Sequence, residues 1–335
     1  MEVDIKYKSS NLSRMAVVRI GDKELVTPAY FPAISSLQPF DVKELFDFII
    51  EKKYGKMLLS SYDINKDERL HENKSVGEVS QYSRTGNFVM MDSGVFESYW
   101  KSDKTWTFKE YRDTLEKVDA DFYATFDFSP NILPRELDLY SELITRIRES
   151  RDVITNGVPL EILHGRTPEE LIGIVSKYAS SLGNEQSRII AIPERECGAS
   201  VLERGRNIMQ ITHKLRERSE KFLLHILGCG NPISMALYAY CGADTFDSID
   251  WTSNIFEKNE NKIFDFSQLD LIGCHCEACS MEEKSYINRA LLHNLLFYQQ
   301  HVEKLQYMIK ECTLKDYVQV YLGTPLFRQL EESII

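Results

Sequence analysis

Short apolar runs alternate with amphipathic segments along most of the chain, and this rhythm restricts the possible folds more than any other feature. Runs that are apolar at every position are typical of strands buried on both faces, and their alternation with helices indicates parallel βαβ units. Seven such runs follow residue 55, and AYFPAIS near the N-terminus makes an eighth. Eight units favour a closed (β/α)8 TIM barrel over an open doubly wound sheet. No G-x-G-x-x-G follows a strand, which also argues against the doubly wound alternative. The seven runs are MLLS, FVMMD, DFYATFD, PLEILHG, RIIAIPE, FLLHILG and ADTFDS.

Apolar residues at helical spacing predict the intervening helices. We expect the barrel to cover residues 1–250. An irregular insertion, a zinc-binding motif and a long C-terminal helix packed on the barrel should follow over 251–311, with a tail at 312–335. The polar stretch from Asp63 to Thr85 is expected to be a loop. The predicted helices span Phe40–Lys53, Phe108–Val118, Pro134–Val153, Pro168–Ala179, Ser200–Ser219, Ile233–Cys241 and Glu282–Glu311.

The overall charge excludes one class of function. The chain has 335 residues, of which 43% are hydrophobic, and a net charge of −11. A general polyanion binder carries the opposite charge, so any nucleic-acid contact needs a local basic patch. The basic residues of segment 200–221 are one candidate, although a solvated helical face explains them more simply. They are Arg204, Arg206, Lys214, Arg216, Arg218 and Lys221.

No targeting or membrane signal is evident. The longest apolar runs fall far short of the roughly 18 residues that a membrane span needs, and the N-terminus MEVDIKYKSS lacks the apolar core of a signal peptide. We therefore expect a cytoplasmic protein with no membrane partner.

Three of the seven cysteines, Cys274, Cys276 and Cys279, form a C-x-C-x-x-C cluster just before the long C-terminal helix. An odd total and this spacing indicate metal binding in a reducing compartment more than a disulfide framework. Three thiolates can wrap a tetrahedral zinc ion, and either His293 or His301 on the following helix can return as the fourth ligand. An iron–sulfur cluster and a redox thiol group are the alternatives. Four protein ligands leave no position for water, so the zinc is expected to be structural.

Chemically active residues stand where the predicted strands end. Each alone is ordinary, because a lone strand-end aspartate is usually a turn residue. The carboxyl ends of barrel strands meet on one rim, however, so these side chains should converge. Two carboxylates facing each other suit glycosyl chemistry, in which one attacks the anomeric carbon and the other handles a proton. The residue types alone do not separate Asp247 from Asp244 or Asp250, nor glycosyl transfer from aldol or hydrolase chemistry. The strand-end residues are Asp92, Asp127, His164, Glu194, Gly228 to Gly230, and Asp247.

Three motifs, in this order, resemble those of the tRNA-guanine transglycosylase superfamily. FVMMDSGVF resembles its strand ending in Asp-Ser-Gly-Gly and an aromatic residue. GCGNP followed by GADTFDS resembles its glycine turn, helix and Phe-Asp nucleophile strand. CHCEAC with LLHNLLFY resembles its zinc site, closed by a His-Asn pair. The resemblance extends from about Pro28 to Lys310.

The resemblance implies a role for each matching position. Asp247 would be the nucleophile and Asp92 the general acid/base. Phe96 would stack on the base and Asp127 would accept hydrogen bonds from the guanine edge. The implied zinc ligands are Cys274, Cys276, Cys279 and His293. The remaining expected substrate-binding positions are His164, Glu194, Gly228 and Gly230.

The departures from the family pattern point to one of its branches. His164-Gly165-Arg166 replaces the Gln-Gly-Gly whose glutamine touches the base, and Ala191-Ile192 replaces a Gly-Gly pair. SIDWTSN lacks the arginine that grips tRNA, the segment between the cysteines and the zinc-binding histidine is short, and no appended C-terminal RNA-binding domain is expected. These features resemble the DNA-modifying branch, which inserts 7-deazaguanine bases into DNA alongside a partner protein.

The sequence therefore predicts a pentosyltransferase that exchanges guanine for a free 7-deazaguanine base, such as 7-cyano-7-deazaguanine, with DNA favoured over tRNA as substrate. A tRNA-ribosyltransferase is the first alternative. A non-catalytic partner subunit is the second, although the presence of both Asp92 and Asp247 argues against it. A zinc hydrolase is weaker still, because a three-cysteine site lacks the open coordination position of hydrolytic zinc.

Overall fold

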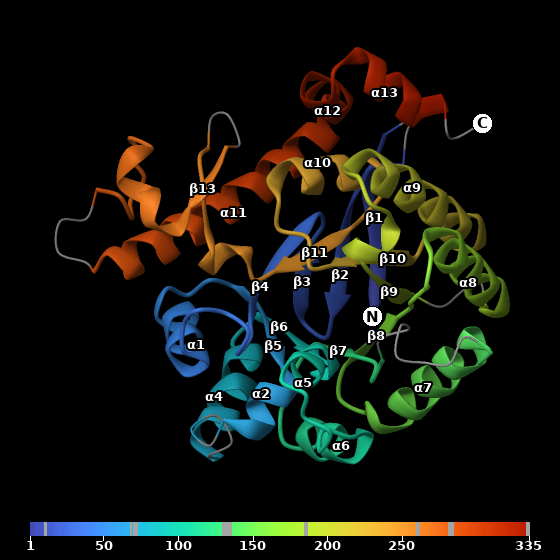
Figure 1. Ribbon diagram of the computed structural model, residues 1–335, viewed down its shortest axis with the longest axis vertical. Helices are drawn as coiled ribbons and strands as arrows, with labels where there is room; N and C mark the ends of the chain where they lie inside the picture. The colour runs from blue at the N-terminus through green and yellow to red at the C-terminus, as the bar shows by residue number, and fades with distance from the viewer. Residues whose placement is uncertain are drawn as a thin grey trace.

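Eight parallel strands close into a barrel, which confirms the predicted (β/α)8 TIM barrel (Figure 1). The computed structural model describes residues 1–332 apart from 10–11, 68, 70–72, 129–135, 184–186, 259–261 and 281–284, and apart from the side chains of 73–75. AYFPAIS supplies the eighth strand, and the last strand pairs with it to close the ring. The strands are β4 (Ala29–Ile34), β5 (Lys56–Ser60), β6 (Phe88–Asp92), β7 (Phe122–Ala124), β8 (Val158–Ile162), β9 (Arg188–Pro193), β10 (Phe222–Leu227) and β11 (Thr245–Ser248).

The barrel strands are mostly apolar because each of their two faces packs against a different core. In β6, Phe88 and Met90 belong to the cluster that fills the barrel interior. Val89 and Met91 point the other way and pack in the cluster beneath the surrounding helices. Side chains alternate across a strand, so burial on both sides favours apolar residues at successive positions, as in β6.

Nine helices between β4 and β11 are described. The six helices predicted there are confirmed, with ends that differ by a few residues; part of the predicted Pro134–Val153 helix lies outside the described residues. The loop predicted over Asp63–Thr85 is wrong, because two helices occupy it and a few apolar side chains, such as Val76 and Val79, suffice to anchor the second. The helices are α1 (Val42–Glu51), α2 (Ser61–Lys66), α4 (Asn73–Arg84), α5 (Val95–Trp100), α6 (Phe108–Leu115), α7 (Leu139–Val153), α8 (Pro168–Ser181), α9 (Val201–Arg218) and α10 (Pro232–Tyr240).

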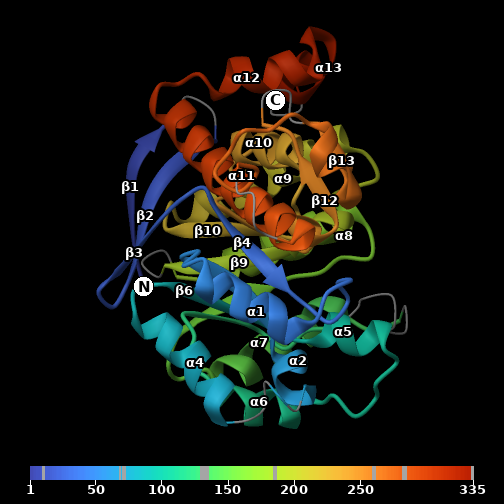
Figure 2. The ribbon, with the colours of Figure 1, turned by 90° about the vertical axis from the view of Figure 1, so that its left-hand side faces the viewer.

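A separate antiparallel sheet, formed by β1 (Glu2–Lys8), β2 (Arg14–Ile20) and β3 (Lys23–Val26), covers one end of the barrel. Figure 2 shows this sheet at the end opposite α5. Val18 and Leu25 extend the interior cluster into the sheet. Arg14 fixes the sheet to the barrel through a buried pair with Asp244, with Nε–Oδ1 at 2.8 Å and Nη2–Oδ2 at 2.9 Å. The barrel is therefore plugged at the amino ends of its strands and opens at their carboxyl ends.

The segment after the barrel forms a hairpin and a long helix that packs on the barrel. The hairpin consists of β12 (Asn254–Phe256) and β13 (Ile263–Asp265), followed by the 3-10 turn η4 (Phe266–Leu271) and by α11 (Tyr286–Lys310). Tyr298 of α11 stacks on Tyr30 of β4 at 3.8 Å between ring centroids, and its hydroxyl donates to the carbonyl of Gly230 at 2.7 Å.

The residues expected to form a tail contain two further helices, α12 (Leu314–Leu322) and α13 (Thr324–Glu331). Phe327 and Leu330 of α13 are buried and belong to the core beneath the barrel helices. Among the helices that the structure describes, none is long and apolar enough to cross a membrane.

Candidate active site

A cavity of about 320 Å³ opens at the carboxyl ends of the barrel strands. Most of the predicted rim residues meet there, although they come from six different strand ends. Gly230 is not part of the cavity wall. The predicted residues that line the cavity are Asp92, Phe96, Asp127, His164, Glu194, Gly228 and Asp247.

Asp247 is held at the end of β11 by two donors on one of its oxygens. Its Oδ1 accepts from the Gly228 N–H at 3.1 Å and lies 3.0 Å from Nε2 of His225. The Nδ1 atom of His225 lies 2.8 Å from the hydroxyl of Thr245, which fixes the imidazole ring. No hydrogen bond from the described residues reaches Oδ2. The carboxylate is therefore oriented through one oxygen, and the other can face a substrate.

The structure also separates Asp247 from the two neighbours that sequence reasoning could not exclude. Asp244 lies at the other end of β11, 1% exposed, and is neutralised by Arg14. Asp250 does line the cavity, but burial raises its pKa and so disfavours its ionised, nucleophilic form. Of the three carboxyl groups, the geometry favours Asp247 as the nucleophile.

The turn after β6 places Asp92 at the cavity wall. Gly94 adopts φ +76°, and a Cβ atom there would lie 2.5 Å from Cβ of Tyr62, so only glycine fits. The N–H of Gly94 donates to Oδ2 of Asp92 at 3.2 Å. Asp92 is thus a turn residue and a cavity residue at once.

Burial raises the pKa of Asp92 well above its ordinary value, and the nearby carboxyl groups of Glu97, Asp127 and Asp247 raise it further. These surroundings favour the protonated form of the Asp92 carboxyl group. This protonation suits a general acid that protonates a leaving base.

Glu97 is a cavity residue that sequence reasoning missed. It lies on α5, is 4% exposed, and its Oε1 accepts from the Ser35 hydroxyl at 2.6 Å. Burial, with a further contribution from Asp63, raises the pKa of Glu97 to about 7. A glutamate in a short surface helix normally faces solvent, so the local sequence carries no signal for this position.

Asp127 and His164 form one hydrogen-bonded unit with Glu196, another residue that sequence reasoning missed. Nε2 of His164 lies 2.9 Å from Oδ2 of Asp127, and its Nδ1 lies 2.9 Å from Oε1 of Glu196. Ser93 donates to Oδ1 of Asp127 at 2.5 Å, and the Gly165 N–H donates to Oε2 of Glu196 at 3.1 Å. Burial by itself lowers the pKa of His164, but its two carboxylate partners more than offset this and raise it to about 9. The ring is therefore an imidazolium that donates to both carboxylates.

Phe96 and Glu194 differ in how far they are available to a ligand. Phe96 is 40% exposed, and the guanidinium carbon of Arg195 lies 5.1 Å from its ring centroid. Oε1 of Glu194 accepts from the Tyr238 hydroxyl at 2.8 Å and from Arg204 at 3.1 Å. Glu194 thus joins the cavity wall to α9 and α10, and its role as a substrate contact stays a prediction.

Comparison with known proteins gives similarity along most of the chain. No family model matches. The tRNA-guanine(15) transglycosylase of Methanococcus maripaludis strain C5 is 23% identical over 94% of this chain and 51% of its own length. Proteins of the same name from Methanopyrus kandleri and Methanosphaera stadtmanae are each 23% identical, over 84% and 88% of this chain and 62% and 44% of their own lengths. Along most of its length the chain is therefore similar to tRNA-guanine transglycosylases. It spans about half the length of the curated relatives that it matches.

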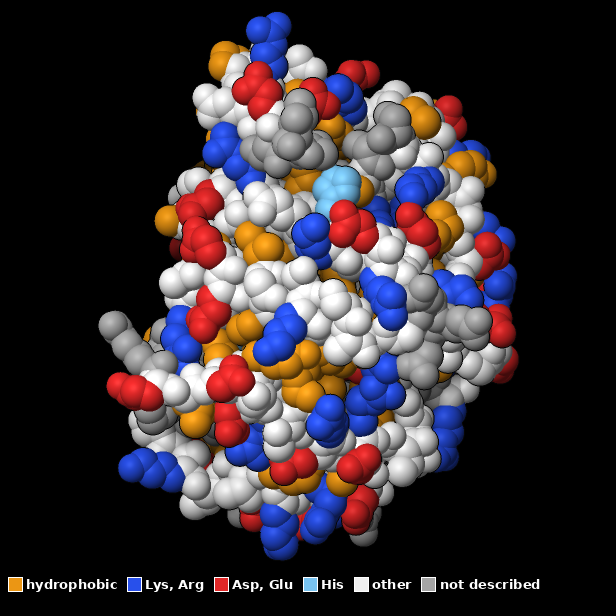
Figure 3. Space-filling view, turned by 90° about the vertical axis from the view of Figure 1, so that its right-hand side faces the viewer, with side chains coloured by type: hydrophobic (Ala, Val, Ile, Leu, Met, Phe, Trp, Pro, Cys, Tyr) orange, Lys and Arg blue, Asp and Glu red, His pale blue; other side chains and the backbone are white. Residues whose placement is uncertain are grey.

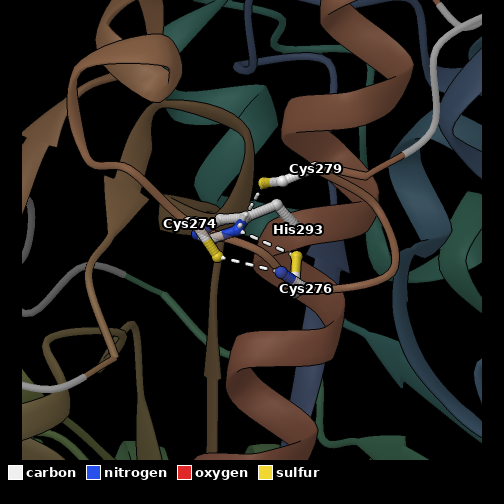
Figure 4. A group of neighbouring side chains, drawn as sticks. All are labelled: Cys274, Cys276, Cys279 and His293. Atoms are coloured by element: carbon white, nitrogen blue, oxygen red, sulfur yellow. Dashed lines mark hydrogen bonds between the residues drawn. The ribbon is translucent and has the colours of Figure 1, made fainter.

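The predicted metal ligands lie together at the start of α11. The ligand atoms of Cys274, Cys276, Cys279 and His293 all lie within 4.8 Å of one another. Figure 4 shows the three cysteines and His293 directed toward a common centre. Nδ1 of His293 lies 3.5 Å and 3.4 Å from the sulfurs of Cys276 and Cys279. This cluster can hold a metal ion.

The contacts of His293 and His301 decide which of these two histidines can be the fourth metal ligand. Nε2 of His293 lies 2.9 Å from the carbonyl of Phe256, a bond that leaves Nδ1 free to ligate, as is usual for metal-binding histidines. His301 is buried elsewhere, 3.0 Å from the carbonyl of Pro232. The donor set is thus three sulfurs and one nitrogen, and His301 does not belong to it.

The basic residues of α9 and the turn that follows do not form an open patch. Arg204 pairs with Glu194, and Lys214 pairs with Glu217 at 3.3 Å. Arg216 is buried and donates to the Gly242 carbonyl, while Arg218 donates to that of Leu182. Figure 3 shows basic and acidic side chains interspersed over the side of the molecule on which α7, α8 and α9 lie. These contacts support the simpler explanation, a face that is partly structural and partly solvated.

Proposed function

We propose that this chain exchanges guanine in nucleic acid for a 7-deazaguanine base through a covalent intermediate on Asp247. The observation that carries the proposal is that Asp92 and Asp247, 155 positions apart in the sequence, line one cavity at the mouth of the barrel. The raised pKa of Asp92 favours its protonated form, and Asp247 presents one oxygen without a protein partner among the described residues. A proton donor and a nucleophile on one cavity are what a retaining glycosyl transfer requires.

The exchange consists of two displacements at the same carbon. A target nucleotide is flipped into the cavity at a cost of a few kcal/mol of unstacking. Oδ2 of Asp247 attacks C1′ of its sugar, the C1′–N9 bond breaks, and Asp92 gives a proton to the departing guanine. N9 of the 7-deazaguanine then attacks C1′, releases the Asp247 carboxylate and returns its proton to Asp92. Atoms and charges balance without a redox cofactor.

Phe96 and Asp127 would recognise the base. Phe96 offers an exposed ring at the cavity wall, on which the base can stack after displacing Arg195. Asp127 would accept the N1 and 2-amino hydrogens of guanine. Both of its oxygens already accept protein hydrogen bonds, so the base has to share Asp127 with Ser93 and His164.

We propose zinc as the ion of the Cys274, Cys276, Cys279 and His293 cluster. Three thiolates and one imidazole are a closed tetrahedral set typical of structural zinc. The ion would hold the hairpin and the start of α11 against the barrel, and it takes no part in the exchange.

DNA is the favoured substrate, and tRNA is the second candidate. The absence of arginine from SIDWTSN and the replacement at His164 favour DNA. The similar proteins are named as tRNA-guanine(15) transglycosylases, which favours tRNA. Incubating the chain with labelled guanine and either duplex DNA or tRNA separates the two, because only the true substrate becomes labelled. Repeating the reaction with a cell extract tests whether a partner protein is required.

The proposal is tested by replacing the two cavity aspartates that could attack C1′. Asp247→Asn should lower base exchange by on the order of 10³-fold or more, while Asp250→Asn should retain most of it. The melting temperature of each variant shows whether it is folded. Exchange at a near wild-type rate by folded Asp247→Asn contradicts the proposal. A wild-type chain that labels neither nucleic acid, with or without extract, supports the non-catalytic partner subunit instead.

A further inference from the structure

Helix α5 exposes three aromatic rings in a continuous series. Phe96, Tyr99 and Trp100 are 40%, 51% and 59% exposed. The ring of Trp100 contacts those of Phe96 and Tyr99 edge to face, with centroids 6.1 Å and 5.6 Å away. Large aromatic side chains bury most of their surface in ordinary packing, and the two other tryptophans of the chain, Trp106 and Trp251, do so here.

The series begins in the candidate active site and leads out of it. Phe96 belongs to the cavity wall, whereas Tyr99 and Trp100 do not. A base held against Phe96 therefore has Trp100, and then Tyr99, as the next aromatic surfaces outside the cavity. Exposed apolar surface that is continuous with a binding site commonly belongs to the same ligand.

Cationic side chains accompany the rings. Arg195 lies over Phe96, and Lys101 follows Trp100 directly, with its Nζ 5.3 Å from the Tyr62 ring. Lys104 is exposed on the same turn. Of the acidic groups nearby, Asp103 pairs with Lys66 at 3.2 Å, and Asp63 lies 3.9 Å from Nζ of Lys101. In a chain of net charge −11, a local arrangement of rings and cations fits a nucleic-acid strand, because bases stack on rings while phosphates meet cations.

We propose that Tyr99 and Trp100 form a stacking platform for the unpaired nucleotides next to the target base. The proposal rests on the function proposed above, because it assumes that the cavity receives a base flipped from a strand. It adds that the preferred substrate is unpaired around its target, as in a loop or a locally opened duplex. Stacking on two rings would hold the strand open while the exchanged base is absent from the cavity.

Trp100 reports directly on its own occupancy, since the other two tryptophans are buried. A short single-stranded oligodeoxynucleotide containing guanine should quench tryptophan fluorescence, and the same sequence as a blunt duplex should quench it less. Trp100→Ala should abolish the quenching and weaken binding, followed by the anisotropy of a labelled oligonucleotide, by on the order of ten-fold. Trp100→Phe should also abolish the quenching but bind within about three-fold of wild type, because it keeps a ring.

Tyr307→Ala is the matched control, because Tyr307 is 63% exposed on α11 and outside the series. All binding is measured in the Asp247→Asn background, so the readout does not depend on base exchange. Absence of quenching together with wild-type affinity of a Tyr99→Ala/Trp100→Ala double variant overturns the platform and leaves the surface to a protein partner. If the oligonucleotide quenches the Asp247→Asn chain while the wild-type chain exchanges no base in DNA or tRNA, the platform is supported and the proposed function alone fails.

Discussion

The Nε2 atom of His164 lies 2.9 Å from Oδ2 of Asp127, and this bond joins the predicted base-binding carboxylate to a positive charge. Glu196 holds the other side of the ring at 2.9 Å, so the imidazolium lies between two carboxylates. A glutamine, which the superfamily pattern has at this position, carries no charge. The charge at this part of the cavity wall therefore depends on the protonation of His164, and so on pH, whereas a glutamine would carry no charge at any pH.

The first prediction concerns stability. The pKa of His164 is raised from its ordinary value of 6.5 to about 9, so its stabilising effect is fully present below about pH 6.5 and is lost as the pH rises through 9. The shift corresponds to roughly 3 kcal/mol. The difference in unfolding free energy between wild type and His164→Gln, measured by urea unfolding, should shrink between pH 6.5 and 10. Parallel stability curves for the two proteins would show that the ring is not charged in the folded state.

The second prediction concerns the proton donor. Glu97 is among the groups that raise the pKa of Asp92, and it is itself ionised above about pH 7. Glu97→Gln removes this negative charge and should lower the pKa of Asp92. The alkaline limb of the exchange-rate profile should then move to lower pH, with little change below pH 7. Glu116→Gln, which changes an exposed side chain, is the control. If the alkaline limb moves by the same amount in both variants, Glu97 does not act on the pKa of Asp92 and this prediction is wrong.

The third prediction concerns Gly230, which lies behind the cavity. A Cβ atom there would lie 2.5 Å from Oγ and 2.7 Å from Cβ of Ser248, and 2.6 Å from Oδ2 of Asp250. Gly230→Ala should displace the residue after Asp247 and lower base exchange by roughly ten-fold or more, since misplaced catalytic groups lose rate steeply. Gly173→Ala, where nothing lies within 4 Å, should leave exchange unchanged. Equal exchange rates in the two variants would mean that this close contact does not position the site.

The fourth prediction concerns the metal site. His293→Ala should lower zinc affinity by at least roughly 100-fold, which is measurable by competition with a chromogenic chelator. His275→Ala is a close control, because His275 is exposed between two of the cysteines and is not part of the cluster. Removal of zinc by EDTA should lower the melting temperature, and exchange should be lost in step with folding. Loss of exchange from a chain that remains fully folded would contradict a structural role.

The fifth prediction concerns the buried pair that fixes the N-terminal sheet. Arg14→Met leaves Asp244, which is 1% exposed, with Arg216 at 3.9 Å as its remaining cationic partner, and should lower the unfolding free energy by about 3 kcal/mol. The double variant Arg14→Met/Asp244→Leu removes both charges and should recover much of this loss. If both variants unfold at the same denaturant concentration, the cost lies in packing and not in the buried charge of Asp244.

Features that depend on one segment and its immediate surroundings were predicted correctly. The apolar runs FVMMD and AYFPAIS form barrel strands. They were recognisable because burial on both faces of a strand favours apolar residues at successive positions. The C-x-C-x-x-C cluster brings three sulfurs together through local chain geometry alone. The polar stretch from Asp63 to Thr85 was predicted wrongly, because a helix on a barrel surface needs only a few apolar contacts, such as Val79, and these are a weak signal in a single sequence.

The sequence by itself determined the barrel, its eighth strand and the cysteine cluster. Only the tertiary structure decided that Asp244 is neutralised by Arg14, whereas Asp247 lies at the open end of the same strand. It alone also placed Glu97 beside Asp92, and Glu196 against His164. The physical reason is that apolar periodicity records whether a residue is buried, whereas the charge and reactivity of a carboxyl group depend on which distant segments the closed barrel brings against it.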